Sequence, residues 1–335
     1  MIPLVALIAF ATPQAPVERE ITFKGAGGFE LHGVFAAPSS SPKAPCVLLL
    51  PGSGPNDRDG NQLPGLISNL QKEISGRLLR QGVATFRFDK RAVPSIYMSL
   101  WPKADEEYNT FMSFDNFVTD AKAAFDTMKA QSEVDPHRAA VIGHSEGCLL
   151  SLAFSSRLSR ADQPKTLVLL GSPGRTVAVV LRQQLQELFE RQKLTPEKIK
   201  ENMDNVDRAI DQISKDSTTP SDLPKTPLFR ALFQARTTKM MHGLFVTDPL
   251  PLARKFYGPV LLITGEYDQD VSPTDDTGPL EKAFKSRHNA EVKVVIAPHG
   301  SHSLKDAPDR DHDTYAGPVI PMAMDEICAW IKATL

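Results

Sequence analysis

Cysteine is scarce in this 335-residue chain, which has three cysteines in all. Cys46, Cys148 and Cys328 stand far apart in apolar stretches, so their spacing supports neither a disulfide framework nor a CxxC metal or redox motif. We therefore expect three buried free thiols. We also expect no metal and no organic cofactor.

Excess positive charge is missing as well. The chain has 38 Lys and Arg residues against 40 Asp and Glu residues, a formal net charge of -2. It shows no basic stripe and no zinc-finger spacing, so we exclude nucleic acid as a partner. The short Gly52-Ser53-Gly54 run lacks the third glycine of a dinucleotide-binding loop, and nothing else favours an oxidoreductase.

Long hydrophobic runs are also absent, because the apolar N-terminus, Met1 to Ala11, is too short to span a bilayer. It ends in an A-x-A cleavage pattern but lacks the positive region of a signal peptide. Residues 1–19 are thus either a signal peptide or an apolar leader. A signal peptide would be cleaved near Thr12 and would favour a periplasmic or secreted location over the cytoplasm. Neither alternative predicts stable membrane insertion.

What is present is an ordinary core-forming composition, 41% hydrophobic and 23% charged residues. Segments 20–24 and 29–37 flank a glycine-rich turn and predict an antiparallel hairpin. Short apolar runs of the kind found in strands buried on both faces then follow, at residues 46–50, 83–88, 139–142, 166–170, 260–264 and 292–297.

Apolar residues at helical spacing separate these runs, over residues 66–79, 114–128 and 321–335. Alternation of strand and helix predicts an α/β fold with a mostly parallel sheet flanked by helices on both faces. Residues 174–257 interrupt the alternation, and we interpret them as an inserted helical cap between core segments 20–173 and 258–335. The cap residues expected to pack the cap or to form an acyl pocket are Leu185, Leu188, Phe189, Phe229, Leu232, Phe233, Met240, Met241, Leu244 and Phe245.

The segment Gly143-His144-Ser145-Glu146-Gly147 lies between a predicted strand and a predicted helix. Such a turn needs glycines on both sides so that the backbone can bend and the serine can stand exposed. The N-terminus of the following helix favours a developing oxyanion. The pattern therefore predicts Ser145 as a nucleophile.

A serine nucleophile needs a base, and the base needs an orienting carboxylate. Asp268 and His302 each follow a predicted strand, in the chain order expected for this arrangement. Glu266 and Asp270 are alternatives for the acid, and His299 is the alternative for the base. A metal pair of His299 and His302 lacks a third ligand.

The oxyanion hole should use the backbone NH of Glu146, the residue after the nucleophile, and one NH from a loop after an early strand. The loop containing Gly52, Ser53 and Gly54 supplies that donor, either from Ser53 or from Gly54. An ordinary glycine-proline turn is the plainer interpretation of the same residues.

Together these residues resemble the α/β-hydrolase superfamily, and in particular bacterial carboxylesterases related to its serine aminopeptidase-like and dienelactone hydrolase-like branches. Segment 51–61, PGSGPNDRDGN, resembles their SGSGPQDRDG loop; segment 88–91, FDKR, resembles YDKRG; and segment 247–249, TDP, resembles a DP signature. The chain departs from the family's pattern at two places. Where those esterases have KRGVGKS, residues 90–96 of this chain read KRAVPSI, and where they have GExDxQV, residues 265–271 read GEYDQDV, which keeps Asp268. The resemblance implies an α/β-hydrolase fold with a catalytic triad.

The family resemblance also places a group of charged residues around the loops at one end of the sheet. These residues are Asp57, Arg58, Asp59, Asp89, Lys90 and Arg91. These residues either bind a substrate carboxylate or support the oxyanion loop through ion pairs, and we favour support. Arg58 is the candidate for either role.

The sequence thus predicts a serine carboxylesterase that hydrolyses uncharged short-to-medium acyl esters through an acyl-enzyme. The expected partner is a small ester molecule, and homo-oligomerisation is left open. A peptidase, thioesterase or acyltransferase on the same triad is the first alternative, and a non-catalytic binding protein on the same scaffold is the second.

Overall fold

The computed structural model describes residues 17–39, 43–312 and 314–335. The predicted leader, including its proposed cleavage point near Thr12, lies almost wholly outside these residues. Among the described helices, none combines the length and the apolar character needed to cross a bilayer.

One eight-stranded sheet runs through the molecule in the order β1-β2-β4-β3-β5-β6-β7-β8. The β1–β2 and β2–β4 pairs are antiparallel and all other neighbours are parallel. The predicted opening hairpin and the mostly parallel sheet are therefore confirmed. The strands are β1 Val17–Lys24, β2 Glu30–Ala37, β3 Ala44–Leu50, β4 Ala84–Phe88, β5 Val134–His144, β6 Leu167–Leu170, β7 Val260–Gly265 and β8 Val292–Ala297.

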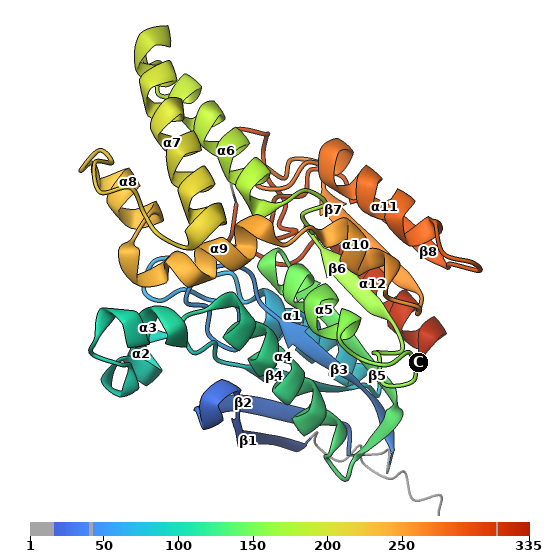
Figure 1. Cartoon of the computed structure of the whole chain (residues 1–335). Helices are drawn as coiled ribbons and strands as arrows, with labels where there is room; N and C mark the ends of the chain where they lie inside the picture. The colour runs from blue at the N-terminus through green and yellow to red at the C-terminus, as the bar shows by residue number, and fades with distance from the viewer. Residues whose placement is uncertain (1–16, 40–42, 313) are drawn as a thin grey trace, which may run out of the picture.

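Helices cover both faces of this sheet (Figure 1). They are α1 Leu70–Arg80, α2 Pro94–Tyr97, α3 Asp105–Phe111, α4 Phe114–Lys129, α5 Glu146–Ser156, α6 Val177–Arg191, α7 Pro196–Asp216, α8 Pro227–Leu232, α9 Thr238–Val246, α10 Pro249–Arg254, α11 Gly278–Lys285 and α12 Pro321–Thr334. The described residues also contain three 3-10 turns, η1 Ala26–Gly28, η2 Met98–Leu100 and η3 Ala235–Thr237, and one π-helical turn, η4 Pro273–Thr277.

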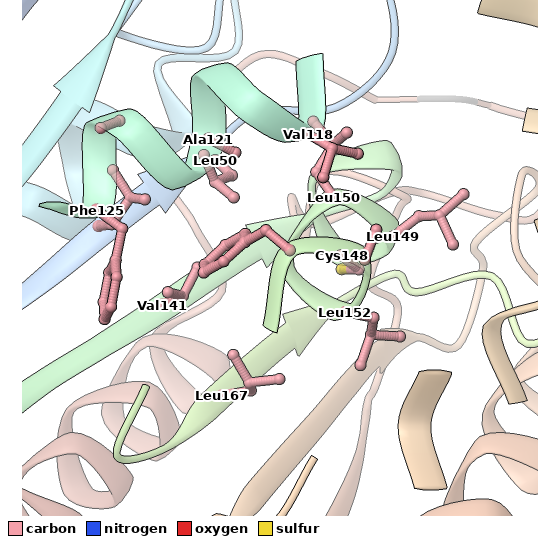
Figure 2. Close-up of a cluster of buried hydrophobic side chains, with 14 of the residues drawn as sticks. Leu50, Val118, Ala121, Phe125, Val141, Cys148, Leu149, Leu150, Leu152 and Leu167 are labelled. Atoms are coloured by element: carbon pink, nitrogen blue, oxygen red, sulfur yellow. The ribbon is translucent and has the colours of Figure 1, made fainter. Parts of the chain in front are cut away.

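Strand alternation divides the core into two layers. Leu48 and Leu50 of β3 point to the face covered by α4 and α5, whereas Val47 and Leu49 point to the face covered by α1 and α12. Figure 2 shows the first layer, where Leu150 of α5 lies beside Val118 of α4. This packing fixes the start of α5, and with it the turn that carries Ser145.

Two sequence predictions are wrong in detail. The helix predicted over residues 66–79 begins only at Leu70, and Ile67 is exposed in the preceding loop. The strand β8 is not buried on both faces, because it is the edge strand of the sheet and its side chains are mostly half-buried or exposed. Helices α2, α3 and α11 were not predicted.

Between β6 and β7 the chain forms helices α6 to α10, and α6 to α9 stand over one end of the sheet (Figure 1). Helices α6 and α7 pack around their own apolar cluster, which includes Leu185, Phe189, Val206 and Ile213. The last helix of the segment, α10, packs instead against α5 and α11 of the core.

Candidate active site

Ser145 occupies a sharp turn between β5 and α5. Its backbone has φ 53° and ψ -121°, a strained conformation for a residue with a side chain. A Cβ at Gly143 would lie 2.6 Å from the Gly147 carbonyl oxygen, and one at Gly147 would lie 2.4 Å from the Leu50 carbonyl oxygen. Glycine is therefore required at both positions, because β5, α5 and the end of β3 approach too closely at this turn to leave room for a Cβ.

His302 and Asp268 come together from the loops that follow β8 and β7. Nδ1 of His302 lies 2.9 Å from Asp268 Oδ2 and 3.0 Å from Oδ1, and both side chains are buried. The backbone amides of Asp270 and Val271 donate to Asp268 Oδ1 at 2.9 and 2.8 Å. The carboxylate is thus held firmly against one nitrogen of the imidazole, which leaves Nε2 as the nitrogen available for proton transfer.

The alternatives for these roles lie elsewhere. His299 is an exposed side chain stacked on Tyr267, and Glu266 accepts a hydrogen bond from the His299 backbone amide. Asp270 faces the opposite ring nitrogen, with Oδ2 at 3.9 Å from His302 Nε2. The geometry therefore gives Asp268, not Glu266 or Asp270, the orienting position on Nδ1.

Ser145 and His302 line one cavity of about 280 Å³. Gly52, Ser53 and Glu146 line the same cavity, as the oxyanion-hole prediction requires, whereas Gly54 and Arg58 are not among its described lining residues. Asp268 lies behind the imidazole. Segments that follow β3, β5 and β8 thus bring the predicted serine, histidine and amide donors to a single cavity.

The cap contributes to this cavity differently from the prediction. Val177, Val180 and Gln184 of α6 line it, and none of the ten predicted cap residues is among its described lining residues. Eight of the ten pack in or against the cap's own cluster, and the other two, Met240 and Leu244, belong to the main core. Residues of α6 line the cavity because the first turns of this helix lie over the site. The larger apolar side chains further along the cap pack its helices against one another.

Lys90 joins the two segments that carry the predicted oxyanion donors. Its ammonium group donates to the Gly52 carbonyl at 2.8 Å and lies 2.7 Å from Glu146 Oε1. Both side chains of this ion pair are almost fully buried, 3% and 2% exposed. Asn56 Nδ2 donates to the carbonyls of Gly52 and Ser53 at 2.9 and 2.6 Å, which further fixes the loop.

Of the other charged residues of this set, Arg58, Asp59, Asp89 and Arg91 form ion pairs within the protein, whereas Asp57 accepts hydrogen bonds from the backbone amides of Asp59 and Asn61. The Arg58 guanidinium lies 2.6 Å from Asp89 Oδ2, and the Arg58 backbone amide donates to the same carboxylate. Arg91 pairs with buried Asp120 at 2.6 Å. Arg58 is thus paired with Asp89 and is not among the described residues that line the cavity, which favours the predicted supporting role over substrate binding.

Sequence reasoning missed two residues that pack against the triad. Nε2 of His144 lies 3.0 Å from the His302 carbonyl oxygen, so Nε2 carries the proton and donates to it. Enclosure of the ring lowers the pKa of His144 to about 3, which keeps the imidazole neutral. A Cβ on Gly171, which has φ 54°, would lie 3.1 Å from the His302 ring. The sequence pattern could have indicated both residues, because His144 ends β5 directly before Ser145 and Gly171 directly follows the next buried strand, β6.

No described group of three His, Cys, Asp or Glu side chains is arranged to hold a metal ion. The three cysteines are buried and free. Burial raises the pKa of the Cys46 and Cys148 thiols to about 12, so neither is poised as a nucleophile.

Comparison with known proteins supplies the family. The family model described as serine aminopeptidase, S33, matches residues 67–309, well over half of the chain and including all three predicted triad residues. The chain belongs to this family. It is therefore a hydrolase with the α/β-hydrolase fold, and the predicted fold class and family resemblance are confirmed.

This hydrolase also resembles individual proteins along its length. Esterase EstD of Thermotoga maritima is 26% identical over 325 residues, which cover 96% of this chain and 69% of that protein. Est1E from Butyrivibrio proteoclasticus has a TM-score of 0.56 at 15% identity and covers 94% of this chain and 98% of its own. The esterase domain of a Rhodothermus marinus protein has a TM-score of 0.53 at 16% identity, covering 95% and 98%. The two structural likenesses show the fold alone.

Proposed function

We propose that this hydrolase is a serine carboxylesterase that forms an acyl-enzyme on Ser145. One observation carries the proposal: Ser145, strained at a strand-to-helix turn, shares a cavity with His302, whose Nδ1 is held 2.9 Å from a buried Asp268 carboxylate. A serine, an imidazole and an orienting carboxylate in this relation are the parts required for nucleophilic acyl transfer.

In the proposed mechanism His302 Nε2 removes the proton of the Ser145 hydroxyl as its Oγ attacks the ester carbonyl. Asp268 stabilises the imidazolium that forms, and the amides of Glu146 and Ser53 stabilise the tetrahedral oxyanion. His302 then gives its proton to the departing alcohol. Water repeats the attack on the acyl-enzyme, releases the carboxylic acid and restores Ser145.

The residues that line the cavity favour substrates with uncharged acyl groups of short to medium length. Leu66, Val177, Val180 and Val271 contribute apolar side chains to a space of about 280 Å³, near the lower end of ordinary ligand pockets. The relationship to an esterase along almost the whole chain supports an ester as the substrate. The family description leaves a peptidase as the alternative, which would have to protonate a poorer, amine leaving group.

The test is hydrolysis of p-nitrophenyl esters from acetate to laurate by the wild type and by Ser145→Ala. We expect activity that falls by several powers of ten in the variant, because removing a triad nucleophile has that effect. Ser156→Ala is the matched control, since Ser156 lies on the same helix with its hydroxyl bonded to the Ala153 carbonyl, and it should keep wild-type activity.

A fluorophosphonate label separates the remaining outcomes. Labelling of the wild type without ester hydrolysis would refute the esterase assignment and redirect attention to amide, thioester or acyl-transfer substrates. Absence of both labelling and hydrolysis in a folded protein would favour a non-catalytic binding role. Retained activity in Ser145→Ala would refute the acyl-enzyme itself.

A further inference from the structure

A second carboxylate lies beside the proposed base, on the cavity side. Asp270 Oδ2 is 3.9 Å from His302 Nε2, the nitrogen opposite the one held by Asp268. Gln184 of α6 donates to Asp270 Oδ1 and to its carbonyl oxygen, both at 3.1 Å. The Asp270 side chain is 39% exposed and lines the cavity, so it faces whatever occupies that space.

Among the described residues, no lysine or arginine forms an ion pair with Asp270, whose carboxylate contacts Gln184 and His302. The titratable side chains in the described lining of the cavity are those of His144, Glu146, Asp270, His302 and Tyr315, and this lining contains no lysine or arginine. The buried ion pair with Lys90 neutralises Glu146.

Arginines lie beside the site in a neighbouring cavity, which Asp270 also borders and which Arg175, Arg191 and Arg310 line. Arg175 pairs with Asp276 at 2.7 Å, whereas Arg191 and Arg310 donate to neutral groups, the Gln269 side chain and the Glu266 carbonyl. The carboxylates of Glu187, Glu190 and Asp311 line that cavity as well and offset the charge of its arginines. Asp270 therefore gives the described lining beside His302 a net negative charge.

We propose that Asp270 is a specificity-determining residue that selects substrates by charge. It repels esters that carry a carboxylate near the scissile bond and accepts neutral or cationic ones, because like charges a few ångströms apart in a partly closed cavity interact strongly. This inference rests on the proposed ester hydrolysis and extends it. The acid product is itself an anion, so the same repulsion favours its departure.

Matched aryl acetates isolate the charge of the substrate. The first pair is 4-acetoxybenzoate, an anion, and 4-acetoxybenzamide, its neutral counterpart of similar shape. The second pair is 4-acetoxy-N,N,N-trimethylanilinium, a cation, and 4-tert-butylphenyl acetate, its neutral isostere. The measurement is the ratio of kcat/KM within each pair, for the wild type and for Asp270→Asn at one pH. Any effect of the variant on His302 as a base cancels in these ratios, because both members of a pair use the same base.

In Asp270→Asn we expect the anion-to-neutral ratio to rise about tenfold and the cation-to-neutral ratio to fall about tenfold. Asp306→Asn is the control, since Asp306 is an 81%-exposed carboxylate four residues after His302 and outside the cavity lining. Its ratios should stay within about twofold of wild type. Unchanged ratios in Asp270→Asn would overturn the proposal.

Two further measurements keep the test decisive. If Asp270→Asn does not fold, the wild-type anion-to-neutral ratio is measured as NaCl rises from about 0.02 to about 0.5 M; screening should raise that ratio, and a flat response would overturn the proposal. Ser145→Ala is assayed on the same four acetates. Loss of activity in Ser145→Ala together with unchanged ratios in Asp270→Asn would refute charge selection alone, whereas an active Ser145→Ala would refute the proposed function.

Discussion

Replacing Lys90 with methionine tests how the oxyanion hole is held. The Lys90 ammonium contacts the Gly52 carbonyl at 2.8 Å and the Glu146 carboxylate at 2.7 Å, and so ties together the two segments whose amides we assign to the oxyanion. Methionine has a similar length but no charge and no donor. The variant therefore strands the Glu146 carboxylate, 2% exposed, without its counter-charge.

The magnitude follows from that burial. Removing one partner of a buried ion pair costs about 3–5 kcal/mol, a large part of the roughly 5–15 kcal/mol that stabilises a typical protein. Losing one oxyanion donor typically lowers kcat by about 10²–10³-fold. We expect Lys90→Met to lower the free energy of unfolding by about 3 kcal/mol. We also expect it to lower kcat by about a hundredfold, with KM within about threefold of wild type.

Urea unfolding and p-nitrophenyl acetate kinetics measure the two effects separately. The double variant Lys90→Met/Glu146→Gln removes the unpaired buried charge, so it should recover most of the stability. Its kcat should stay low because the Gly52 carbonyl still lacks the hydrogen bond from Lys90 and, among the described residues, keeps only the one from Asn56. Lys72→Met is the control, since Lys72 is 60% exposed and its ion pair with Asp59 is long at 3.5 Å. It should change stability by less than about 0.5 kcal/mol. A folded Lys90→Met with near-normal kcat would refute the reasoning.

Three other predictions concern the surroundings of the site. Gly171→Ala should lower kcat in the ester assay at least about tenfold, because a Cβ there would lie 3.1 Å from the imidazole of the proposed base. Gly27→Ala is the control: Gly27 has a similar positive φ but open space around it, so this variant should keep wild-type kcat. Because the pKa of His144 is lowered to about 3 from an unfolded value near 6.5, the unfolded state binds the extra proton between these values. The free energy of unfolding should therefore fall by up to about 1.4 kcal/mol for each pH unit below about 6.5. Denaturant titrations at pH 7 and pH 5 should show this loss, and the His144→Gln variant should lose less stability between the two pH values. Cys46 and Cys148 should resist Ellman's reagent in the native protein and react only after unfolding, since burial raises both thiol pKa values to about 12; rapid native labelling would contradict this.

The sequence by itself determined the local features of this protein. Apolar runs separated by helical patterns specify strands and helices because side-chain periodicity reports which face of an element is buried. The glycines flanking Ser145 specify a tight turn, because only residues without a Cβ fit between strand and helix there. The placement of Ser145, Asp268 and His302 after three different strands followed from the same patterns, since the carboxyl ends of parallel strands meet at one edge of a sheet.

Only the tertiary structure decided which distant side chains meet. Periodicity gives the face of a helix but not its neighbour, so the sequence could not show that Val177, Val180 and Gln184, rather than the larger cap residues, line the cavity. It could not show that β8 lies at the sheet edge, because strand order depends on how the connections cross. The pairing of Lys90 with Glu146, 56 positions away, likewise exists only because β4 and β5 flank β3 in parallel, so that their carboxyl ends lie at the same edge of the sheet.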